Sequence, residues 1–243
     1  MPLCSFSYHQ SNLKEMLYVP LNVLILGKCE YEQALKIQYE LLEKRQQNRI
    51  EDTLILVEHP PIITLGKNAV KENIKASETY LKEHGISIKN INRGGDVTYH
   101  GYGQIVGYPI INLKAKNIGV KEFVKTLEEI FIDVLKDNHN IDAKRDEHHT
   151  GVWVNDDKIA AIGLAVKRSV TMHGFAFNVN TNLDHFGLII PCGIKDKGVT
   201  SLQKLKGGLP LDINNEYNSI IKYFCDLLSY DNYKIVNLKE ILN

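Results

Sequence analysis

The chain has 243 residues, 44% of them hydrophobic, and its 29 Lys and Arg residues balance 29 Asp and Glu residues. This length and composition suit a single packed core and exclude an intrinsically disordered chain. A formal net charge of zero gives no bulk attraction to nucleic acid, and no apolar run approaches the ~20 residues that a membrane span needs. We therefore predict a globular protein without nucleic-acid or membrane partners.

Cysteine usage predicts a reducing compartment. The cysteines at positions 4, 29, 192 and 225 form no CxxC pair and no metal-ligand spacing, which argues against a disulfide framework. No stretch near the start is apolar enough for a signal peptide, so we expect a cytoplasmic protein. Residues 1–20 are expected to be an N-terminal extension without a function, followed by one domain over 21–243.

Hydrophobic periodicity places strands and helices along the chain, with no repeat and no linker rich in Pro, Gly or Ser. Strands cluster around helices and do not alternate with them strictly. This arrangement favours an α/β (α+β) domain with mixed sheets flanked by helices over a doubly wound parallel fold. Predicted strands cover 21–26, 53–57, 62–65, 86–91, 97–99, 105–113, 151–154, 159–166 and 170–179, and predicted helices cover 30–49, 78–83, 120–135 and 213–228.

The stretch from Arg93 to Gln104 is too rich in glycine and polar side chains to be core. Its glycines fit neither the GxGxxG pattern nor a P-loop, in which GK is followed by Ser or Thr, so the stretch indicates a nucleotide site only weakly. Such glycine density favours a loop that wraps a ligand with its backbone. Arg93 and His100 would then hold polar groups of that ligand.

Cys192 follows the apolar run 188–190 and stands between Pro191 and Gly193. It could pack as a small buried hydrophobe. Its flanks favour another interpretation, because a proline, a glycine and the end of a strand would expose the thiol beside backbone amides that can hold an oxyanion. A thiolate near a cation takes an acyl group as a thioester, so we predict that Cys192 is a nucleophile.

Lys158 follows the polar turn 155–157 and opens the run 158–163, whose small residues would let a substrate lie against a strand. Lys158 is either a solvated lysine of a hairpin or the cation that stabilises the Cys192 thiolate. The residues alone leave both interpretations open.

The remaining histidines give weaker signals. His59 and His173 are either site residues or ordinary hydrogen-bonded histidines, and the segment 173–178 is core, the wall of an apolar slot, or both. The adjacent His148 and His149 have no third ligand at a recognisable spacing, so we predict no metal site.

Taken together, these motifs resemble the lipoyl(octanoyl) transferases from about Leu21 to about Leu205. One departure is Tyr102, which stands where the family has proline between two glycines; it leaves Cys192 and Lys158 intact and bears on the conformation of the loop. Several motifs in the same order make the resemblance specific. They are Glu58 to Pro61, Leu65 and Gly66, Arg93 to Gly95, Thr98, His100 and Gly101, Gly103 and Gln104, Gly107 to Pro109, Thr150 to Val154, Lys158 to Gly163, His173 and Gly174, Asn178, and Pro191 to Gly193.

The resemblance implies the biotin/lipoate protein ligase fold and an acyltransferase of lipoate biosynthesis that needs no cofactor. It would move octanoyl from acyl carrier protein to a lysine of lipoyl domains, in 2-oxoacid dehydrogenase subunits or in the glycine cleavage H protein. Cys192 would carry the acyl group as a thioester, and Lys158 would stabilise its thiolate. The substrate-binding residues implied in the same way are Arg93, Gly94, Gly95, Asp96, Val97, Thr98, Tyr99, His100, Ala161, Ile162, Gly163, Gly174, Phe175 and Ala176.

Three alternatives stay open. A lipoate protein ligase would activate a free acid with ATP and magnesium, but it has no use for a Pro-Cys-Gly nucleophile. An amidotransferase would move octanoyl between lipoyl domains through a similar cysteine, and a noncatalytic acyl-binding module would form no covalent adduct. Because acyl carrier proteins and lipoyl domains are acidic as families, we expect Arg93, Lys167 and Arg168 to attract them at the mouth of the site.

Overall fold

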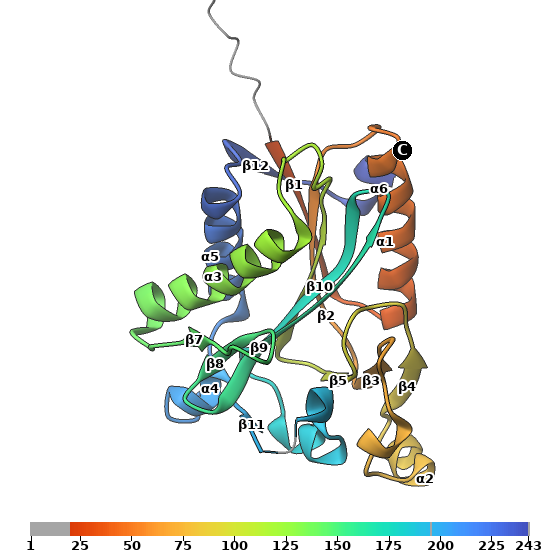
Figure 1. Ribbon diagram of the computed structural model, residues 1–243, viewed down its shortest axis with the longest axis vertical. Coiled ribbons are helices and arrows are strands. Elements are labelled where there is room, and N and C mark those ends of the chain that lie inside the picture. Colours follow the sequence, from red (N-terminus) through yellow and green to blue (C-terminus); the bar gives the residue numbers. More distant parts are fainter. Residues whose placement is uncertain (1–19, 195, 243) are drawn as a thin grey trace, which may run out of the picture.

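The computed structural model describes residues 20–194 and 196–242. Within these ranges a large mixed sheet joins nine strands, in the order β12-β1-β2-β6-β10-β9-β8-β7 with β11 added beside β9 (Figure 1). The strand β1 pairs parallel with both β2 and β12. The strands β6, β10, β9 and β8 pair antiparallel, each with the next in this order. The strands are β1 (Pro20–Lys28), β2 (Thr53–Glu58), β6 (Gln104–Ile110), β7 (Lys144–Arg145), β8 (Val152–Val154), β9 (Asp157–Lys167), β10 (Val170–Asn178), β11 (Gly198–Val199) and β12 (Asn232–Ile235).

Helices cover both faces of the large sheet. The helices α3 (Val120–His139) and α5 (Ile213–Leu227) lie on one face, and α1 (Tyr31–Gln46) and α6 (Leu238–Leu242) lie on the other (Figure 1). Successive side chains of a strand point to opposite faces, so the continuous apolar run of β2 feeds both cores. Leu54 and Leu56 pack with α3 and α5, whereas Ile55 and Val57 pack with α1.

A second sheet of order β4-β3-β5 builds a smaller core with the short helix α2. The strand β5 of this sheet contacts the 3-10 turn that contains Cys192. The second sheet therefore brings the glycine-rich stretch to the predicted nucleophile. Its elements are β3 (Ile62–Leu65), β4 (Ser87–Asn90), β5 (Val97–His100) and α2 (Glu78–Glu83), and the adjoining short helices are η1 (Lys71–Asn73), η2 (Leu183–Leu188), η3 (Pro191–Gly193) and α4 (Leu202–Leu205).

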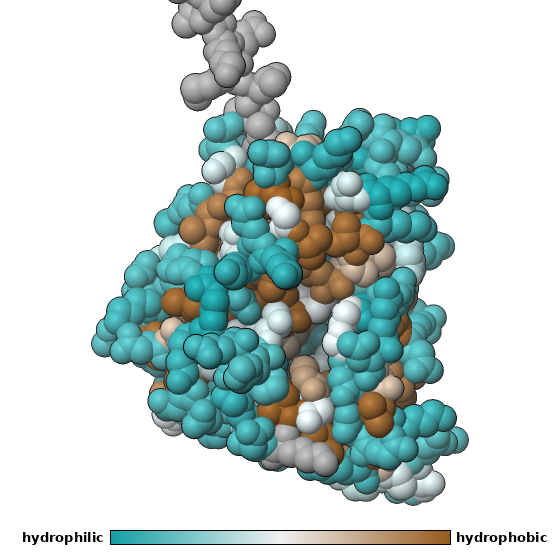
Figure 2. All heavy atoms as spheres, viewed as in Figure 1, coloured by the Kyte–Doolittle hydropathy of each residue, from teal (hydrophilic) through white to brown (hydrophobic). Residues whose placement is uncertain are grey.

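The long antiparallel ribbon of β9 and β10 carries the other predicted site residues. Ala161 pairs with Ala176, and Gly163 pairs with Gly174. Figure 2 shows that hydrophobic residues gather in the middle of the face turned to the viewer, and that hydrophilic residues frame them.

The predicted fold class is confirmed, and most predicted elements lie within a few residues of the observed ones. The expected strand at 188–190 is wrong: Leu188 ends the 3-10 helix η2, and Ile189 makes only an isolated bridge with Ile74. The strand β12, which extends the sheet beyond β1, was not predicted. Apart from Pro20, the predicted extension lies outside the described residues. Among the helices of the described ranges, none is long and apolar enough to cross a membrane.

Candidate active site

Cys192 lies in a tight 3-10 turn. Its backbone has φ of 56° and ψ of 18°, a left-handed conformation that costs a non-glycine residue about 1 kcal/mol. Gly193 follows with φ of +71°, and a Cβ at this position would lie 3.0 Å from Oδ2 of Asp96. The amide of Ile190 donates to the carbonyl of Asn73 at 2.7 Å and so ties the turn to the short helix η1. The thiol is held half-buried by this turn and not, as expected, at a strand end.

The other described cysteines are poor nucleophiles. Cys29 and Cys225 are buried, and burial raises the pKa of Cys225 to about 11 and also raises the pKa of Cys29. Such thiols are almost wholly protonated at neutral pH. Cys4 lies outside the described residues. Among the described cysteines, Cys192 is therefore the accessible thiol.

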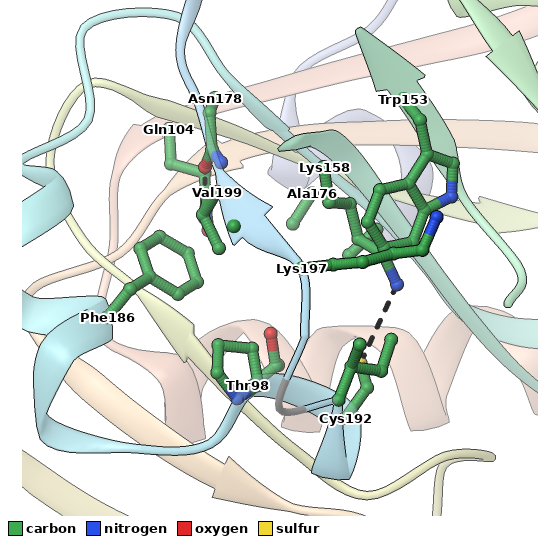
Figure 3. Close-up of a pocket in the computed structure, with 14 residues that line it drawn as sticks. Thr98, Gln104, Trp153, Lys158, Ala176, Asn178, Phe186, Cys192, Lys197 and Val199 are labelled. Atoms are coloured by element: carbon green, nitrogen blue, oxygen red, sulfur yellow. Dashed lines mark hydrogen bonds between the residues drawn. The ribbon is translucent and has the colours of Figure 1, made fainter. Parts of the chain in front are cut away.

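Lys158 is the second residue of β9 and only 8% exposed, so its side chain is not a solvated hairpin lysine. Its Nζ lies 3.8 Å from Sγ of Cys192 (Figure 3). The same Nζ donates to the carbonyl of Thr150 at 3.0 Å. The ammonium also lies 4.6 Å from the ring centroid of Trp153, a cation–π contact. Gly151 makes room for this stem, because a Cβ there would lie 3.3 Å from Cε of Lys158.

Two cavities meet at Cys192. Both are lined by Thr98, Ala161, Ala176 and Cys192, and they extend in different directions from that junction. The first, which we call the lysine cavity, is lined by Lys158. The second, which we call the glycine cavity, is lined by Arg93, Gly94 and Gly95. The predicted substrate-binding residues that line the glycine cavity are Arg93, Gly94, Gly95, Thr98, His100, Ala161, Ile162, Gly163, Gly174, Phe175 and Ala176.

The remaining predicted substrate-binding residues do not line either cavity, in part because successive side chains of β5 point to opposite faces. Thr98 and His100 line the glycine cavity, whereas Val97 and Tyr99 point to the opposite face and pack in the core of the second sheet. Asp96 lies before the strand, where its carboxylate accepts from the amides of Val97 and Val70 and from the side chain of Asn73. Val97, Tyr99 and Asp96 therefore shape the site without lining either cavity.

Arg93 is buried, which corrects the expectation that it attracts partners at the mouth of the site. Its guanidinium donates to the carbonyls of Thr64 and Gly94 and to the Thr64 hydroxyl, all of them neutral acceptors. Burial lowers the pKa of Arg93, and a negative charge on Cys192 is the largest effect that opposes this. Arg93 thus adds positive potential on the glycine-cavity side of the thiol.

Lys167 and Arg168 also lie away from the site. They form the exposed turn between β9 and β10, nine residues along β9 from Lys158. At 3.3 Å per residue this is about 30 Å.

Two buried histidines, His100 and His173, line the glycine cavity, and His59 lies behind them with its ring centroid 6.1 Å from that of His100. Burial is the main cause that keeps each of the three neutral. The pKa is lowered to about 4 for His59, to about 3 for His100 and to about 4 for His173. The ring of His59 bonds to the carbonyl of Cys29 and to the hydroxyl of Tyr108, at 2.7 Å each. His173 also lies near Arg93, whose charge lowers its pKa further.

Trp153 and Lys197 lie at the site but were not predicted to be site residues. Two ammonium groups contact the Trp153 ring, with Nζ of Lys158 4.6 Å and Nζ of Lys197 4.8 Å from its centroid. Lys197 pairs with Asp146 at 2.7 Å and lines the lysine cavity. Trp153 does lie in a quoted motif, and its position one strand away from Lys158 could have indicated this contact; the partners of Lys197 depend on the tertiary fold.

A side-chain network fixes the floor of the lysine cavity. Oε1 of Gln104 accepts from Nδ1 of His100 at 2.8 Å, and Nε2 of Gln104 donates to the side chain of Asn178 at 2.9 Å. Asn178 in turn donates to the carbonyl of Thr200 at 3.0 Å, and the amide of Thr200 donates to the carbonyl of Lys158. Buried polar groups that satisfy each other hold one geometry, so this network positions the strand that carries Lys158.

The backbone amides after Cys192 do not form the oxyanion site that the sequence predicted. The amide of Gly193 donates to the carbonyl of Ile190, and the amide of Ile194 donates to the carbonyl of Pro191, at 3.0 Å each. Neither amide is therefore free to hold an oxyanion in this conformation, and the ammonium of Lys158 is the donor that faces the thiol. In the part of the chain that the structure describes, no cluster of His, Cys, Asp and Glu could hold a metal ion.

Comparisons with known proteins agree with this architecture. The family model of the lipoyl protein ligase A/B catalytic domain matches residues 30–225. The chain is 57% identical to the octanoyltransferase of Alkaliphilus metalliredigens over 87% of this chain and 96% of that protein. It is 52% identical to the octanoyltransferase of Desulforamulus reducens, over 85% and 90% of the two chains.

Solved structures show the same fold at low sequence identity. A lipoate-protein ligase A bound with ATP superposes with a TM-score of 0.73 at 16% identity, over 93% of this chain and 91% of that one. The bipartite lipoate protein ligase of Thermoplasma acidophilum gives 0.72 at 17% identity, over 93% and 89%. Because the family model covers most of the sequence and the curated relatives share more than half of their aligned residues with it, the chain belongs to the lipoyl protein ligase A/B catalytic-domain family.

Proposed function

We propose that this chain transfers octanoyl in lipoate biosynthesis, from a thioester donor to a lysine of a protein acceptor, through a thioester on Cys192. The observation that carries the proposal is the 3.8 Å approach of Nζ of Lys158 to Sγ of Cys192 at the junction of two cavities. The curated relatives named octanoyltransferase supply the acyl group.

In the first half of the reaction, the Cys192 thiolate attacks the carbonyl carbon of the donor thioester. A bond forms between Sγ and the acyl carbon, the donor carbon–sulfur bond breaks, and the leaving thiolate takes a proton from Lys158. The ammonium of Lys158 stabilises the thiolate before attack, and it faces the region where negative charge develops on the carbonyl oxygen. Lys158 is left neutral.

In the second half, the neutral amine of the acceptor lysine attacks the Cys192 thioester. A carbon–nitrogen bond forms, the bond to Sγ breaks, and neutral Lys158 accepts the proton that the attacking nitrogen loses. This restores the ammonium and the thiolate. The donor thioester already stores the energy of the amide bond, so the sequence of steps needs no ATP and no metal.

The meeting of two cavities suits this exchange. The glycine cavity has apolar and backbone walls that suit an acyl chain, and the lysine cavity opens past Phe186, Ile194 and Val199. The leaving thiol and the incoming amine would then approach Cys192 in turn by the second route. A ligase that activates a free acid has no step for Cys192, so the contact with Lys158 favours transfer.

The protein partners are proposed to be octanoylated acyl carrier protein as donor and lipoyl domains as acceptors. An open groove lined by Lys75, Phe186, Pro191 and Lys197 continues the lysine cavity to the surface. Lys71 and Lys75 are exposed, and within the described ranges neither forms an ion pair. This groove, and not the distant Lys167 and Arg168, is where acidic partners would dock. The free described cysteines fit a reducing, cytoplasmic setting.

The test is transfer without nucleotide. The purified chain is incubated with octanoyl-acyl carrier protein and an apo lipoyl domain, in EDTA and without ATP, and the mass of the lipoyl domain is followed. We expect an octanoyl group on the domain with the wild type and none with Cys192→Ser. Strict dependence on ATP would favour a ligase instead. Transfer from an octanoylated lipoyl domain that outpaces transfer from the carrier protein would assign the amidotransferase reaction.

A further inference from the structure

The peptide group that joins Thr150 to Gly151 is held at both of its ends. Its carbonyl oxygen, on Thr150, accepts from Nζ of Lys158 at 3.0 Å. Its N–H, on Gly151, donates to Oε1 of Glu128 at 2.9 Å. A peptide group is planar, so fixing the direction of its N–H also fixes the direction of its carbonyl. One rigid unit therefore connects the carboxylate of Glu128 to the ammonium that faces Cys192.

Glu128 is a buried carboxylate with two partners. It is 6% exposed on α3, whose other buried side chains are all apolar. Burying a carboxylate is costly unless hydrogen bonds or opposite charges compensate. Here the Gly151 amide bonds to one oxygen, and Nε of Arg145 lies 3.1 Å from the other. Arg145 also pairs with Glu129 at the surface, so the contact that distinguishes Glu128 from Glu129 is the one to Gly151.

The backbone at Gly151 is suited to this orientation of the peptide. Its φ is +130°, which a residue with a side chain rarely adopts, and a Cβ there would lie 2.6 Å from the carbonyl oxygen of Ala160. Glycine thus lets the segment before β8 approach β9 closely. The helix α3 packs against both strands, which brings Glu128 to the Gly151 amide.

The Thr150 carbonyl can only accept, and this determines what Lys158 presents to Cys192. While Lys158 is an ammonium, one of its three N–H groups bonds to the carbonyl and another faces Sγ, 3.8 Å away. When Lys158 is neutral, an N–H still bonds to the carbonyl, and the lone pair is left to face the acyl sulfur and the incoming amine. The same hydrogen bond therefore orients Lys158 in both halves of the proposed reaction.

We propose that Glu128 is a positioning residue for acyl transfer: it holds the peptide between Thr150 and Gly151, which keeps Nζ of Lys158 beside Cys192. The inference rests on the proposed function, in which Lys158 stabilises the thiolate and later accepts a proton. Without the carboxylate, the buried Gly151 amide loses its partner and the peptide can turn. Nζ would then occupy several positions in the lysine cavity, most of them away from Sγ.

Three substitutions of Glu128 separate the reach of its oxygen from its charge. Glu128→Gln is neutral but keeps an oxygen at the same reach, so it can still accept from the Gly151 amide. Glu128→Asp keeps the charge but withdraws the oxygens by about 1.5 Å, the length of one carbon–carbon bond. Glu128→Leu fills the space and removes both the oxygen and the charge.

The test compares single-turnover rates of Cys192 adduct formation with octanoyl-acyl carrier protein, read by intact-protein mass. We expect Glu128→Gln to stay near the wild-type rate. Glu128→Asp and Glu128→Leu should lower the rate by about 10- to 100-fold, the range for losing a group that orients a functional side chain. In steady-state transfer these two variants should lower kcat and leave the KM for the apo lipoyl domain unchanged, because Glu128 lines neither cavity.

Two matched controls account for lost stability and for a lost ion pair. Glu216→Leu removes a carboxylate of similar burial, 4% exposed against 6%, that pairs with His139 at 3.1 Å. Glu129→Leu removes the surface carboxylate that pairs with Arg145. Both variants should keep the wild-type rate at a temperature where circular dichroism shows every variant folded.

A folded Glu128→Leu variant with the wild-type rate would overturn the proposal. Equal losses in Glu128→Gln and Glu128→Leu would also overturn it, because the effect would then be one of charge. If Glu128→Leu does not fold, Glu128→Asp and Glu128→Gln decide, since the proposal requires that only the first be slow. An equal loss in Glu216→Leu would assign the effect to stability. Absence of any octanoyl adduct on wild-type Cys192 would instead contradict the proposed function.

Discussion

At the scale of single residues, the approach of Lys158 to Cys192 depends on burial. A solvated ammonium near a surface thiol would be screened by water and salt, whereas Lys158 is almost fully enclosed and has Trp153 against its charge. The ammonium keeps hydrogen-bond partners in the carbonyl of Thr150 and in Cys192 itself. The Cys192 thiolate is therefore placed to balance the charge of the buried Lys158 ammonium.

We expect Lys158→Met to slow the formation of the Cys192 adduct by about 100-fold or more, which is the range of a positioned acid–base group. Methionine keeps the length of the stem and its packing, so the variant should remain folded. The matched control is Lys204→Met, because Lys204 is exposed and its ammonium lies 3.9 Å from Asp157, the residue before Lys158. Adduct formation at the wild-type rate in a folded Lys158→Met variant would remove Lys158 from the mechanism.

The sequence could single out Cys192 as a candidate nucleophile because its motif is local, whereas the residues around Lys158 left two interpretations open until the resemblance was considered. The Pro-Cys-Gly turn and the strand that opens at Lys158 are each contained in a few residues. His173 left both of its interpretations open, since its meaning depends on a left-handed φ inside a strand and on Gln38, which lies 135 residues away in the chain. Such a property arises only when distant segments pack together.

At the scale of elements, strand alternation decides which residues of a motif can touch a ligand. The glycine-rich stretch was predicted as a continuous set of substrate-binding residues, but β5 turns Thr98 to the cavity and Tyr99 away from it. The sequence could have assigned these two residues to different faces, because neighbouring side chains of a predicted strand point in opposite directions. The strand expected before Cys192 is absent for another reason. Leu188 and Ile189 pack in the small core although their segment is not a strand, and hydrophobic periodicity cannot distinguish such a segment from a short strand.

Three buried histidines predict that the stability of the folded chain falls in acid. His59 follows β2, His100 ends β5 and His173 lies inside β10. In the folded chain the pKa values are about 4 for His59, 3 for His100 and 4 for His173, against about 6.5 when unfolded. The unfolded chain therefore binds protons first, so stability is retained above about pH 6.5 and falls as the pH drops towards about 4. Each histidine contributes up to about 1.4 kcal/mol per pH unit in this window.

Urea unfolding at several pH values between about 7 and 4.5 measures this slope. His59→Gln removes one of the three groups and should flatten the slope, and the exposed His148→Gln should leave it unchanged. A free energy of unfolding that does not change over this range would contradict the assignment of neutral buried histidines.

At the scale of the whole molecule, the neutral net charge makes the position of the basic residues important. Lys167 and Arg168 are exposed at the β9–β10 turn, and at the other end of the ribbon Lys75 is exposed on the groove beside η3, with exposed Lys71 four residues before it. Only the groove continues the cavity that contains Lys158. The same fold carries ligases among its solved relatives, so the protein partners would be set by such surfaces and not by the core.

Reversing the charge of each pair of basic residues tests which pair belongs to the docking surface. We expect Lys71→Glu with Lys75→Glu to raise the KM for octanoyl-acyl carrier protein several-fold and to weaken its salt dependence. The matched reversal of Lys167 and Arg168 to glutamate should leave both quantities near their wild-type values. The rate of Cys192 alkylation by a small reagent serves as the control for site integrity. If the reversal at the β9–β10 turn has the larger effect, the docking surface lies there instead.

The most direct test of the central claim is the location of the acyl group during turnover. The chain is mixed with octanoyl-acyl carrier protein, quenched in acid within the first turnover, digested and mapped by mass. We predict an octanoyl mass on the peptide that contains Cys192, none on the peptides of Cys29 and Cys225, and loss of the label when an apo lipoyl domain is added. An unmodified Cys192 in a preparation that transfers octanoyl would contradict a thioester relay.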